Sequence, residues 1–198
     1  MMPSLLVATR NRGKVVELHT MLDGIVEQVL SINDVPPMPE TIEDGETFVD
    51  NALKKAREAC HMTGLPTLAD DSGLVVPLLD GAPGIYSARY AGIGATDAEN
   101  NAKLLSEIER LGIMQPPAQF VCCLAYVTPD GFERVFTGAV DGVISSFPKG
   151  DHGFGYDPLF LVAGFNCTMA ELPLEIKNSI SHRAQALQNF VAFLRESK

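Results

Sequence analysis

Two adjacent carboxylates, Asp70 and Asp71, follow a short apolar run and precede Ser72, Gly73 and a second apolar run. Successive side chains of a strand point to opposite faces, so we expect the two carboxylates to face opposite ways, one toward a cleft. Carboxylates beside buried strands cost free energy unless they are paired, hydrogen-bonded or bound to a metal. Because Asp-Asp-Ser-Gly also suits a turn, a simple turn between two strands is the alternative.

A second polar group follows the apolar stretch 4–8 and precedes a helical pattern that runs to about Asp23. Its residues are Thr9, Arg10, Asn11, Arg12, Gly13 and Lys14. A helix N-terminus offers N–H groups and partial positive charge, which suit a phosphate group. The spacing is not that of a Walker P-loop, and an exposed basic turn is the alternative.

A third polar segment, residues 147–158, alternates glycines with aromatic residues. Glycines let the backbone approach a ligand closely. Phe154 and Tyr156 offer flat faces on either side of Gly155, and Asp157 offers an acceptor. The segment could therefore stack on a base and read its edge, while a connector whose aromatic rings fill the core is the alternative.

Three basic residues, Lys177, His182 and Arg183, lie around the expected start of the last helix. A helix start is again a favourable place for anionic groups. For His182, a surface or capping histidine is the alternative.

Helical and strand patterns are interleaved along the chain, with a hairpin-rich middle. Strands are expected at 4–8, 25–30, on both sides of Asp70 and Asp71, at 118–127, 132–137 and 159–162, and near 139–145; helices are expected after Lys14, from Thr47 to about 62, over 97–111 and from His182. This order predicts an α/β protein with a partly antiparallel sheet.

Length and composition limit the class of protein. The 198 residues fit one large domain or two lobes that share a core, and the formal net charge of −10 argues against general nucleic-acid binding. We expect neither a signal peptide nor a membrane span, because the start lacks a basic region and no apolar run is long enough. The spacing of the four cysteines favours reduced thiols in the cytoplasm.

Six motifs occur in order from near the N-terminus to the last helix: Thr-Arg-Asn-Arg-Gly-Lys at 9–14, Asp-Gly-Glu-Thr-Phe at 44–48, Ala-Asp-Asp-Ser-Gly at 69–73, Gly-Ile-Tyr-Ser-Ala-Arg-Tyr at 84–90, Gly-Phe-Gly-Tyr-Asp-Pro at 153–158 and Ser-His-Arg at 181–183. Together they resemble the inosine triphosphate pyrophosphatase family, whose bacterial members are the dITP/XTP pyrophosphatases. Each motif alone is weak, but six in order are very specific.

The resemblance implies an enzyme that hydrolyses the non-standard purine nucleoside triphosphates ITP, dITP and XTP to the monophosphate and pyrophosphate. It also implies a Mg²⁺ cofactor, a homodimer, and a single domain over residues 1–198 with an elongated two-lobed mixed-sheet fold and an active-site cleft between the lobes. No membrane and no nucleic acid is expected as a partner.

The resemblance also implies roles for individual residues. Asp71 would be the catalytic acid–base and a metal ligand, Ser72 would contact the substrate, and Glu43 would be the second metal ligand, with Glu40 as the alternative. The remaining candidates would bind the substrate: phosphate at Thr9, Arg10, Asn11, Arg12, Gly13 and Lys14, and nucleotide at Phe154, Gly155, Tyr156, Asp157, Lys177, His182 and Arg183. Arg10 departs from the family, which commonly has glycine there, and this leaves the role of its side chain open.

Two other functions are considered. Maf-like nucleotide pyrophosphatases act on pyrimidine or modified nucleotides, but the motifs at 153–157 and 181–183 argue against them. A non-catalytic nucleotide-binding module is disfavoured because Glu43, Asp70, Asp71 and Lys177 are all present.

Overall fold

The computed structural model describes residues 2–196, except for the side chain of Arg12. The chain forms two compact units. Unit 1 consists of Met1–Asp71, Cys122–Gly138 and Arg183–Lys198, and unit 2 of Ser72–Val121 and Ala139–His182. The chain passes from one unit to the other four times, after Asp71, Val121, Gly138 and His182.

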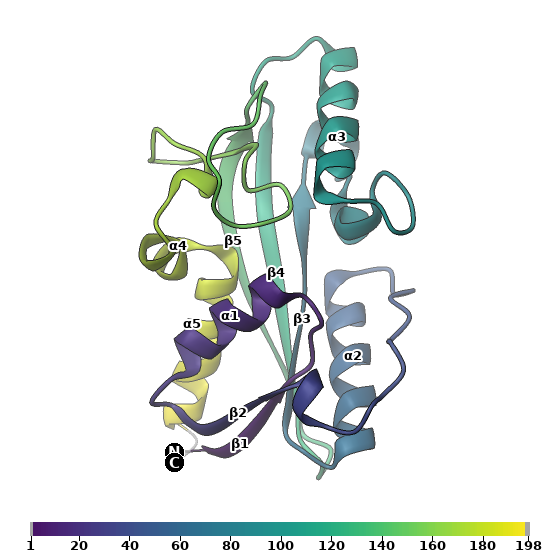
Figure 1. Ribbon diagram of the computed structural model, residues 1–198, viewed down its shortest axis with the longest axis vertical. Helices are drawn as coiled ribbons and strands as arrows, with labels where there is room; N and C mark the ends of the chain where they lie inside the picture. The colour runs from purple at the N-terminus through teal and green to yellow at the C-terminus, as the bar shows by residue number, and fades with distance from the viewer. Residues whose placement is uncertain (1, 197–198) are drawn as a thin grey trace. The chain divides into compact units, whose positions relative to one another are not determined.

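The described residues form a mixed six-stranded sheet with strand order β2-β1-β3-β4-β5-β6 (Figure 1). The strands are β1 Met2–Val7, β2 Val26–Ser31, β3 Thr67–Val75, β4 Pro117–Val127, β5 Glu133–Ile144 and β6 Phe160–Val162. β1 pairs in parallel with β2 and β3, whereas β5 and β6 are antiparallel. This confirms the predicted α/β class with a partly antiparallel sheet.

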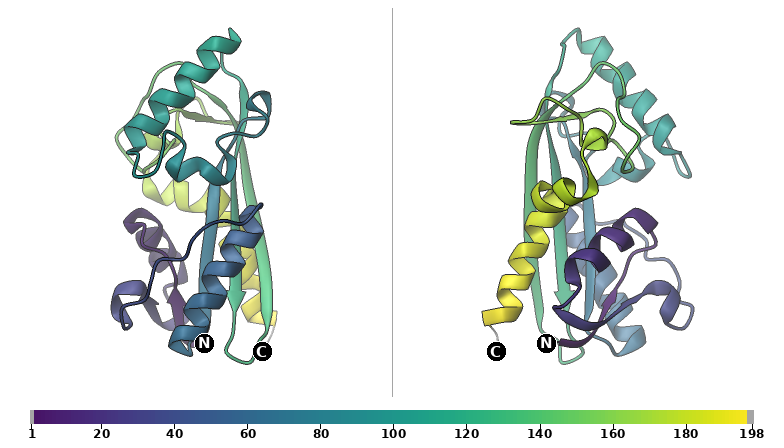
Figure 2. Two further views of the ribbon diagram at one scale, coloured as in Figure 1. Left: turned by 90° about the vertical axis from the view of Figure 1, so that its right-hand side faces the viewer. Right: turned by 60° about the vertical axis from the view of Figure 1, so that its left-hand side comes forward.

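In unit 1, helices cover both faces of the strands. The helices are α1 Arg12–Leu22, α2 Phe48–Thr63 and α5 His182–Glu196. Side chains of α1 and α5 pack with Leu5, Leu68 and Leu124 in one cluster, while α2 packs with Leu6 and Ala69 in another. Neighbouring strand residues thus enter opposite clusters, as the alternation of a strand requires. In Figure 1, α1 crosses α5 and α2 lies apart from both, and the right-hand view of Figure 2 shows α5 running along the strands.

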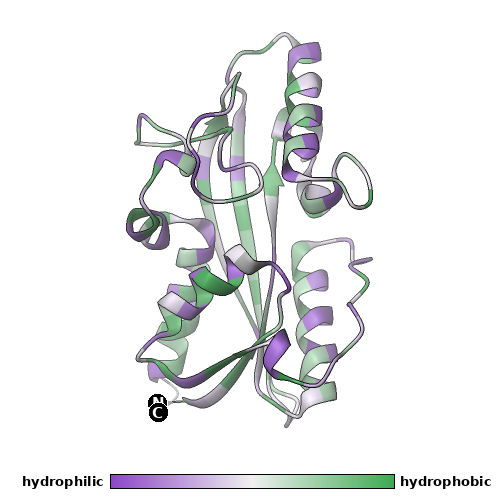
Figure 3. Cartoon of the chain, viewed as in Figure 1, coloured by the Kyte–Doolittle hydropathy of each residue, from purple (hydrophilic) through white to green (hydrophobic). Residues whose placement is uncertain are grey.

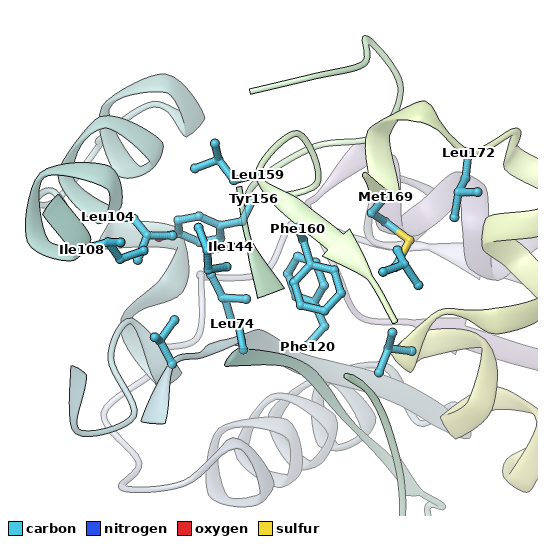
Figure 4. Close-up of a cluster of buried hydrophobic side chains, with 14 residues drawn as sticks. Leu74, Leu104, Ile108, Phe120, Ile144, Tyr156, Leu159, Phe160, Met169 and Leu172 are labelled. Atoms are coloured by element: carbon cyan, nitrogen blue, oxygen red, sulfur yellow. The ribbon is translucent and has the colours of Figure 1, made fainter. Parts of the chain in front are cut away.

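Unit 2 has a single apolar cluster that joins strand residues to α3 Asp97–Leu111 and to the chain around β6. Leu104 and Ile108 of α3 lie near Tyr156, and the rings of Phe120 and Phe160 are 4.4 Å apart between centroids (Figure 4). The remaining helices of the described chain are α4 Leu174–Ile180 and the 3-10 helices Ile32–Asp34, Pro77–Leu79, Gly84–Arg89 and Met169–Glu171.

The predicted helix boundaries of α2 and α3 are set by local capping. Thr47 and Thr96 each form a capping box with the acidic residue three positions later, which satisfies N–H groups at the helix start. Gly64 and Gly112 end the two helices in the left-handed conformation. Both helices carry alternating hydrophobic and hydrophilic bands, which Figure 3 shows clearly for α2.

The structure departs from the expected elements in three places. The two strands expected around Asp70 and Asp71 are one, and the alternative of a turn at Asp-Asp-Ser-Gly is excluded, because β3 runs through it without interruption. The strand expected near 139–145 is the continuation of β5, which is one long strand from Glu133 to Ile144. Helix α4 was not expected, and Lys177 lies within it. Among the described helices, none is long and apolar enough to cross a membrane.

Gly142 of β5 provides a test of the packing against β6. A Cβ atom at this position would lie 2.3 Å from the carbonyl oxygen of Leu161 and 2.6 Å from the Phe160 ring. We expect Gly142→Ala to lower the free energy of unfolding by about 1–3 kcal/mol, because the core would be overpacked. Urea unfolding measures this. The neighbouring exposed Asp141→Ala is the control, and an equal small loss in both variants would contradict the prediction.

Candidate functional site

Strand β3 turns its two carboxylates to opposite faces, as predicted. The Asp70 carboxylate is 2.7 Å from the Lys14 ammonium of α1 and 3.5 Å from Nε of Arg183 of α5. The Asp71 carboxylate instead accepts a hydrogen bond of 3.0 Å from the Asn51 amide and lies 3.7 Å from the Lys55 ammonium, both on α2. Each carboxylate therefore faces the helices that cover its own side of the sheet.

Asp70 is the centre of a buried charge network. It is 1% exposed, and Arg183, which is 2% exposed, also pairs through Nη1 with the buried Glu17 of α1. Burial raises the pKa of Asp70, but the positive charges of Lys14, Arg183 and Lys55 outweigh this effect and hold the pKa well below its usual range. Asp70 is therefore a permanent anion that balances the cations around it.

The negative charge of Asp71 is balanced less well by nearby positive charge than that of Asp70. Burial raises its pKa and the nearby Glu43 charge adds to this, while Lys55 and the Asn51 hydrogen bond only partly offset the rise. The Lys55 ammonium donates to Glu43 at 2.7 Å and so lies next to both carboxylates. For Lys55, burial lowers the pKa, but the charges of Asp70, Asp71 and Glu43 raise it overall. A carboxylate with a raised pKa is a better proton acceptor than an ordinary aspartate.

The segment 9–14 forms the start of α1. The Asn11 side chain caps the helix by accepting from the Lys14 backbone at 3.1 Å, and Thr9 Oγ1 accepts from the Asn11 backbone at 3.3 Å. Arg10 donates to the Met38 carbonyl at 2.8 Å, so its side chain fixes the loop before α2. The Arg12 side chain lies outside the described residues. No acidic residue occupies the first turn of α1, which leaves the helix N-terminus suited to an external anion.

In unit 2, Phe154, Asp157 and Lys177 form a compact group. The Lys177 ammonium is 2.8 Å from Asp157 and 4.8 Å from the centre of the Phe154 ring. Asp157 also accepts a hydrogen bond of 3.0 Å from the Phe154 backbone. Gly153 allows this close turn, since a Cβ there would lie 2.1 Å from the Asp157 carboxylate. The half-buried Phe154 ring is thereby held in one place.

Two side chains of α3 hold the peptide of Gly155. Asp97 accepts from the Gly155 N–H at 2.7 Å, and Asn101, one turn further on, donates to the Gly155 carbonyl at 3.0 Å. The neighbouring Tyr156 ring is buried in the core, and its hydroxyl donates to the Ser87 carbonyl at 2.9 Å. Ring stacking on a ligand is therefore open to Phe154 but not to Tyr156. The alternative, aromatic rings that fill the core, holds for Tyr156.

The remaining candidates are His182, Ser72, Glu43 and its alternative Glu40. His182 is 5% exposed and stacks on Phe120 with 4.9 Å between ring centres, so it is not a surface histidine. The half-buried Ser72 is the residue of β3 that follows Asp71. Glu40 is exposed, whereas Glu43 is half-buried beside Lys55. Within the described residues, no three side chains of His, Cys, Asp or Glu gather in a metal-binding group.

Sequence reasoning missed five residues of these networks. They are Glu17, Asn51, Lys55, Asp97 and Asn101. Helical spacing was the available signal, because Glu17 follows Lys14 by three positions and Lys55 follows Asn51 by four, which places each pair on one helix face. The sequence gives no sign that Asp97 meets a glycine 58 positions away.

The fold and these networks define an α/β protein with paired carboxylates and buried cations suited to an anionic ligand. The chain belongs to the Ham1 family, whose profile matches residues 5–193. It is 55% identical over 186 residues to a dITP/XTP pyrophosphatase of Geobacter sulfurreducens, covering 94% of each chain. The Staphylococcus aureus Ham1 protein has a TM-score of 0.87 at 39% identity, covering 98% of this chain and 100% of its own. A Mycobacterium abscessus nucleoside-triphosphatase, also described as a dITP/XTP pyrophosphatase, has a TM-score of 0.76 at 44% identity, covering 94% of this chain and 98% of its own.

The charge of Asp70 is expected to stabilise unit 1. Asp70→Asn keeps the shape but leaves Lys14 and Arg183 short of a buried counter-charge, so we expect a loss of about 3–5 kcal/mol in the free energy of unfolding at pH 7. The folded state lowers the pKa of Asp70, so the carboxylate stabilises the fold fully at pH values above its unfolded-state pKa of about 3.9. This contribution to the free energy of unfolding is lost progressively as the pH falls below that value. The difference between wild type and variant in urea unfolding should therefore narrow below about pH 4.

Asp44→Asn is the matched control for this experiment. It removes the charge of the exposed Asp44–Lys54 pair and should change the free energy of unfolding by less than about 1 kcal/mol. A loss for Asp70→Asn no larger than that of the control would show that the buried network does not depend on this charge.

The contacts of Gly155 with α3 can be tested by amide hydrogen exchange. Removing the carboxylate in Asp97→Ala leaves the Gly155 N–H without its acceptor, and we expect exchange at Gly155 to accelerate about 10- to 100-fold. Asn101→Ala should have a smaller effect at the same residues. Lys103→Ala, on the same helix but bonded to Tyr90, is the control. Unchanged exchange in Asp97→Ala would mean that α3 does not hold this segment.

Proposed function

We propose that this protein hydrolyses the non-standard purine nucleoside triphosphates ITP, dITP and XTP to the monophosphate and pyrophosphate. The proposal rests on the environment of Asp71 together with the near-complete match to a relative that is named a dITP/XTP pyrophosphatase. Membership of the Ham1 family removes the Maf-like alternative. The buried Asp71 carboxylate, close to Lys55 and Glu43, favours an enzyme over a module that only binds nucleotides.

Asp71 is the proposed catalytic base. It would accept a proton from the water that attacks the α-phosphorus. The new bond joins the water oxygen to the α-phosphorus, the bond from the α-phosphorus to the bridging oxygen breaks, and pyrophosphate leaves with that oxygen. Lys55 lies beside Asp71 and can stabilise negative charge close to it. Ser72, the next residue of the strand, is a proposed substrate contact.

Phosphate and nucleotide would contact different segments. We assign the phosphates to the start of α1, where Lys14 supplies positive charge and the helix N-terminus supplies N–H groups. We assign the nucleoside to the half-buried ring of Phe154, to Lys177, and to His182 and Arg183. Arg183 also balances Asp70 and Glu17, so its proposed contact with the base comes in addition to that structural role.

The donor set fits Mg²⁺, because Glu43 and Asp71 provide the hard carboxylate oxygens that this ion prefers. Both carboxylates contact the same Lys55 ammonium, so they lie close to each other. We propose that these two residues would hold the ion, and Glu43 is a better candidate than the exposed Glu40. When bound, Mg²⁺ would neutralise phosphate charge and lower the pKa of a water molecule. Activity should then be lost on chelation and restored by added Mg²⁺.

We further propose a cytoplasmic homodimer. The cytoplasmic location is supported by the four cysteines, which are all free thiols. The homodimer is supported by the resemblance to a family whose members usually form one, and light scattering of the purified protein would test it.

The substrate panel ITP, XTP, GTP, ATP and UTP tests the function. We expect kcat/KM for ITP and XTP to exceed that for ATP and UTP by about tenfold or more, since one mismatched buried polar group costs about 1–3 kcal/mol. Pyrophosphate release with Mg²⁺ is the measurement. Asp71→Asn, which keeps the shape and loses the charge, should lower kcat by about 100- to 10,000-fold.

Two results would contradict these assignments. Equal rates for ITP and ATP would reject the proposed substrate class. A folded Asp71→Asn variant with nearly wild-type kcat would reject Asp71 as the base, and nucleotide binding without pyrophosphate release by the wild type would identify a binding module instead.

A further inference from the structure

Asn51 is the most deeply buried polar residue beside Asp71, with 0% exposure. Both the nitrogen and the oxygen of its side-chain amide form hydrogen bonds. The nitrogen donates to Oδ2 of Asp71 at 3.0 Å, and the oxygen accepts from the Gly45 backbone at 2.8 Å. One amide therefore joins β3, α2 and the segment that carries Glu43.

Gly45 shows how closely these parts fit. A Cβ atom at residue 45 would lie 2.7 Å from the Asn51 side-chain oxygen and 2.7 Å from Cβ of Asp50. Only glycine can therefore bring the backbone N–H this close to the amide without a shift. The short approach of the Gly45 N–H to the Asn51 amide oxygen fixes which end of the amide faces Gly45. The amide nitrogen, at the other end, must then point toward Asp71.

The two oxygens of Asp71 are thereby distinguished. Oδ2 accepts from Asn51, while Oδ1 is the oxygen nearest the Lys55 ammonium, at 3.7 Å. Asn51 and Lys55 are one helical turn apart on α2, and Lys55 also contacts Glu43 at 2.7 Å. Rotation of the Asp71 carboxylate would break the hydrogen bond to a buried amide, which opposes such a rotation.

We propose that Asn51 is a positioning residue, which fixes the Asp71 carboxylate through one oxygen and turns the other toward Lys55, the lysine that also contacts Glu43. This inference rests on the proposed function, in which Asp71 is the base. Asn51 itself would not touch the substrate. Its effect would pass through Asp71, and the nearby Gly45 would set its orientation.

Three variants separate the contacts of Asn51. Asn51→Ala removes both hydrogen bonds, whereas Asn51→Asp keeps an acceptor for Gly45 and presents an oxygen to Asp71 in place of the donor. Gly45→Ala keeps Asn51, Asp71, Lys55 and Glu43 as they are in the sequence. Its added Cβ atom would displace the Asn51 amide by steric contact. Lys54→Ala is the matched control, because it breaks the exposed Lys54–Asp44 pair between the same helix and the same loop.

We expect all three variants to lower kcat for ITP by about 10- to 100-fold, as loss of a supporting contact or a misplacement of about 1 Å does in other sites. KM should change less than kcat, because the phosphate and nucleoside contacts lie elsewhere. Lys54→Ala should keep both constants within about twofold of wild type. A loss of kcat in Lys54→Ala equal to that of Asn51→Ala would overturn the inference.

A double-variant comparison distinguishes positioning from a general structural role. If Asn51 acts through Asp71, Asn51→Ala should lower kcat in the wild type but have almost no further effect in an Asp71→Asn background. An equal fold loss in both backgrounds would overturn the inference.

Crystal structures of the wild type and of Asn51→Asp give a readout that does not depend on activity. The Asp71 carboxylate should rotate away from its wild-type orientation in the variant, and an unchanged orientation would refute the role of Asn51. If the wild type hydrolyses none of the nucleotides, the proposed function fails, while this structural comparison still decides whether Asn51 orients Asp71.

Discussion

Two adjacent carboxylates in one continuous buried strand are the constraint on which unit 1 depends. A buried carboxylate requires positive charge or hydrogen-bond donors, and the alternation of a strand sends Asp70 and Asp71 to opposite faces. Each face must therefore supply its own partners. Lys14 and Arg183 do so from α1 and α5, and Asn51 and Lys55 do so from α2.

The difference between the two faces gives the carboxylates different chemistry. Asp70 has two cations within 3.5 Å and a lowered pKa, so it serves as a fixed negative charge. Asp71 shares one lysine with Glu43, and its pKa is raised. Two identical side chains in consecutive positions thus become a structural anion and a candidate base, because burial is similar while the neighbouring charges differ.

In unit 2, hydrogen bonds between side chains and the backbone hold the segment 153–157, which carries the candidate nucleoside contacts. Here backbone groups of the segment 153–157 are bound by side chains, with Asp97 and Asn101 on Gly155 and Asp157 on Phe154. These N–H groups already have acceptors, so they are poor candidates for reading a base. The side chains of Phe154 and Lys177 are better placed for that role.

The sequence by itself determined most of the elements and the family. Capping at Thr47 and Thr96, the glycines after the helices and the alternation around Asp70 are local signals, so α2, α3 and the opposite orientation of the carboxylates could be predicted. Six motifs in order sufficed for the resemblance, which the Ham1 profile match supports. The alternative of a turn at Asp-Asp-Ser-Gly is wrong because pairing and burial of β3 override local turn preference.

Only the tertiary structure decided which residues meet. Arg183 and Glu17 are 166 positions apart, Gly155 and Asp97 are 58 apart, and no local pattern encodes such contacts. The same holds for Tyr156, whose ring could serve a ligand or the core until packing placed it in the core. Asn51 and Lys55 look like ordinary polar helix residues in the sequence, and they become neighbours of Asp71 because α2 packs across β3.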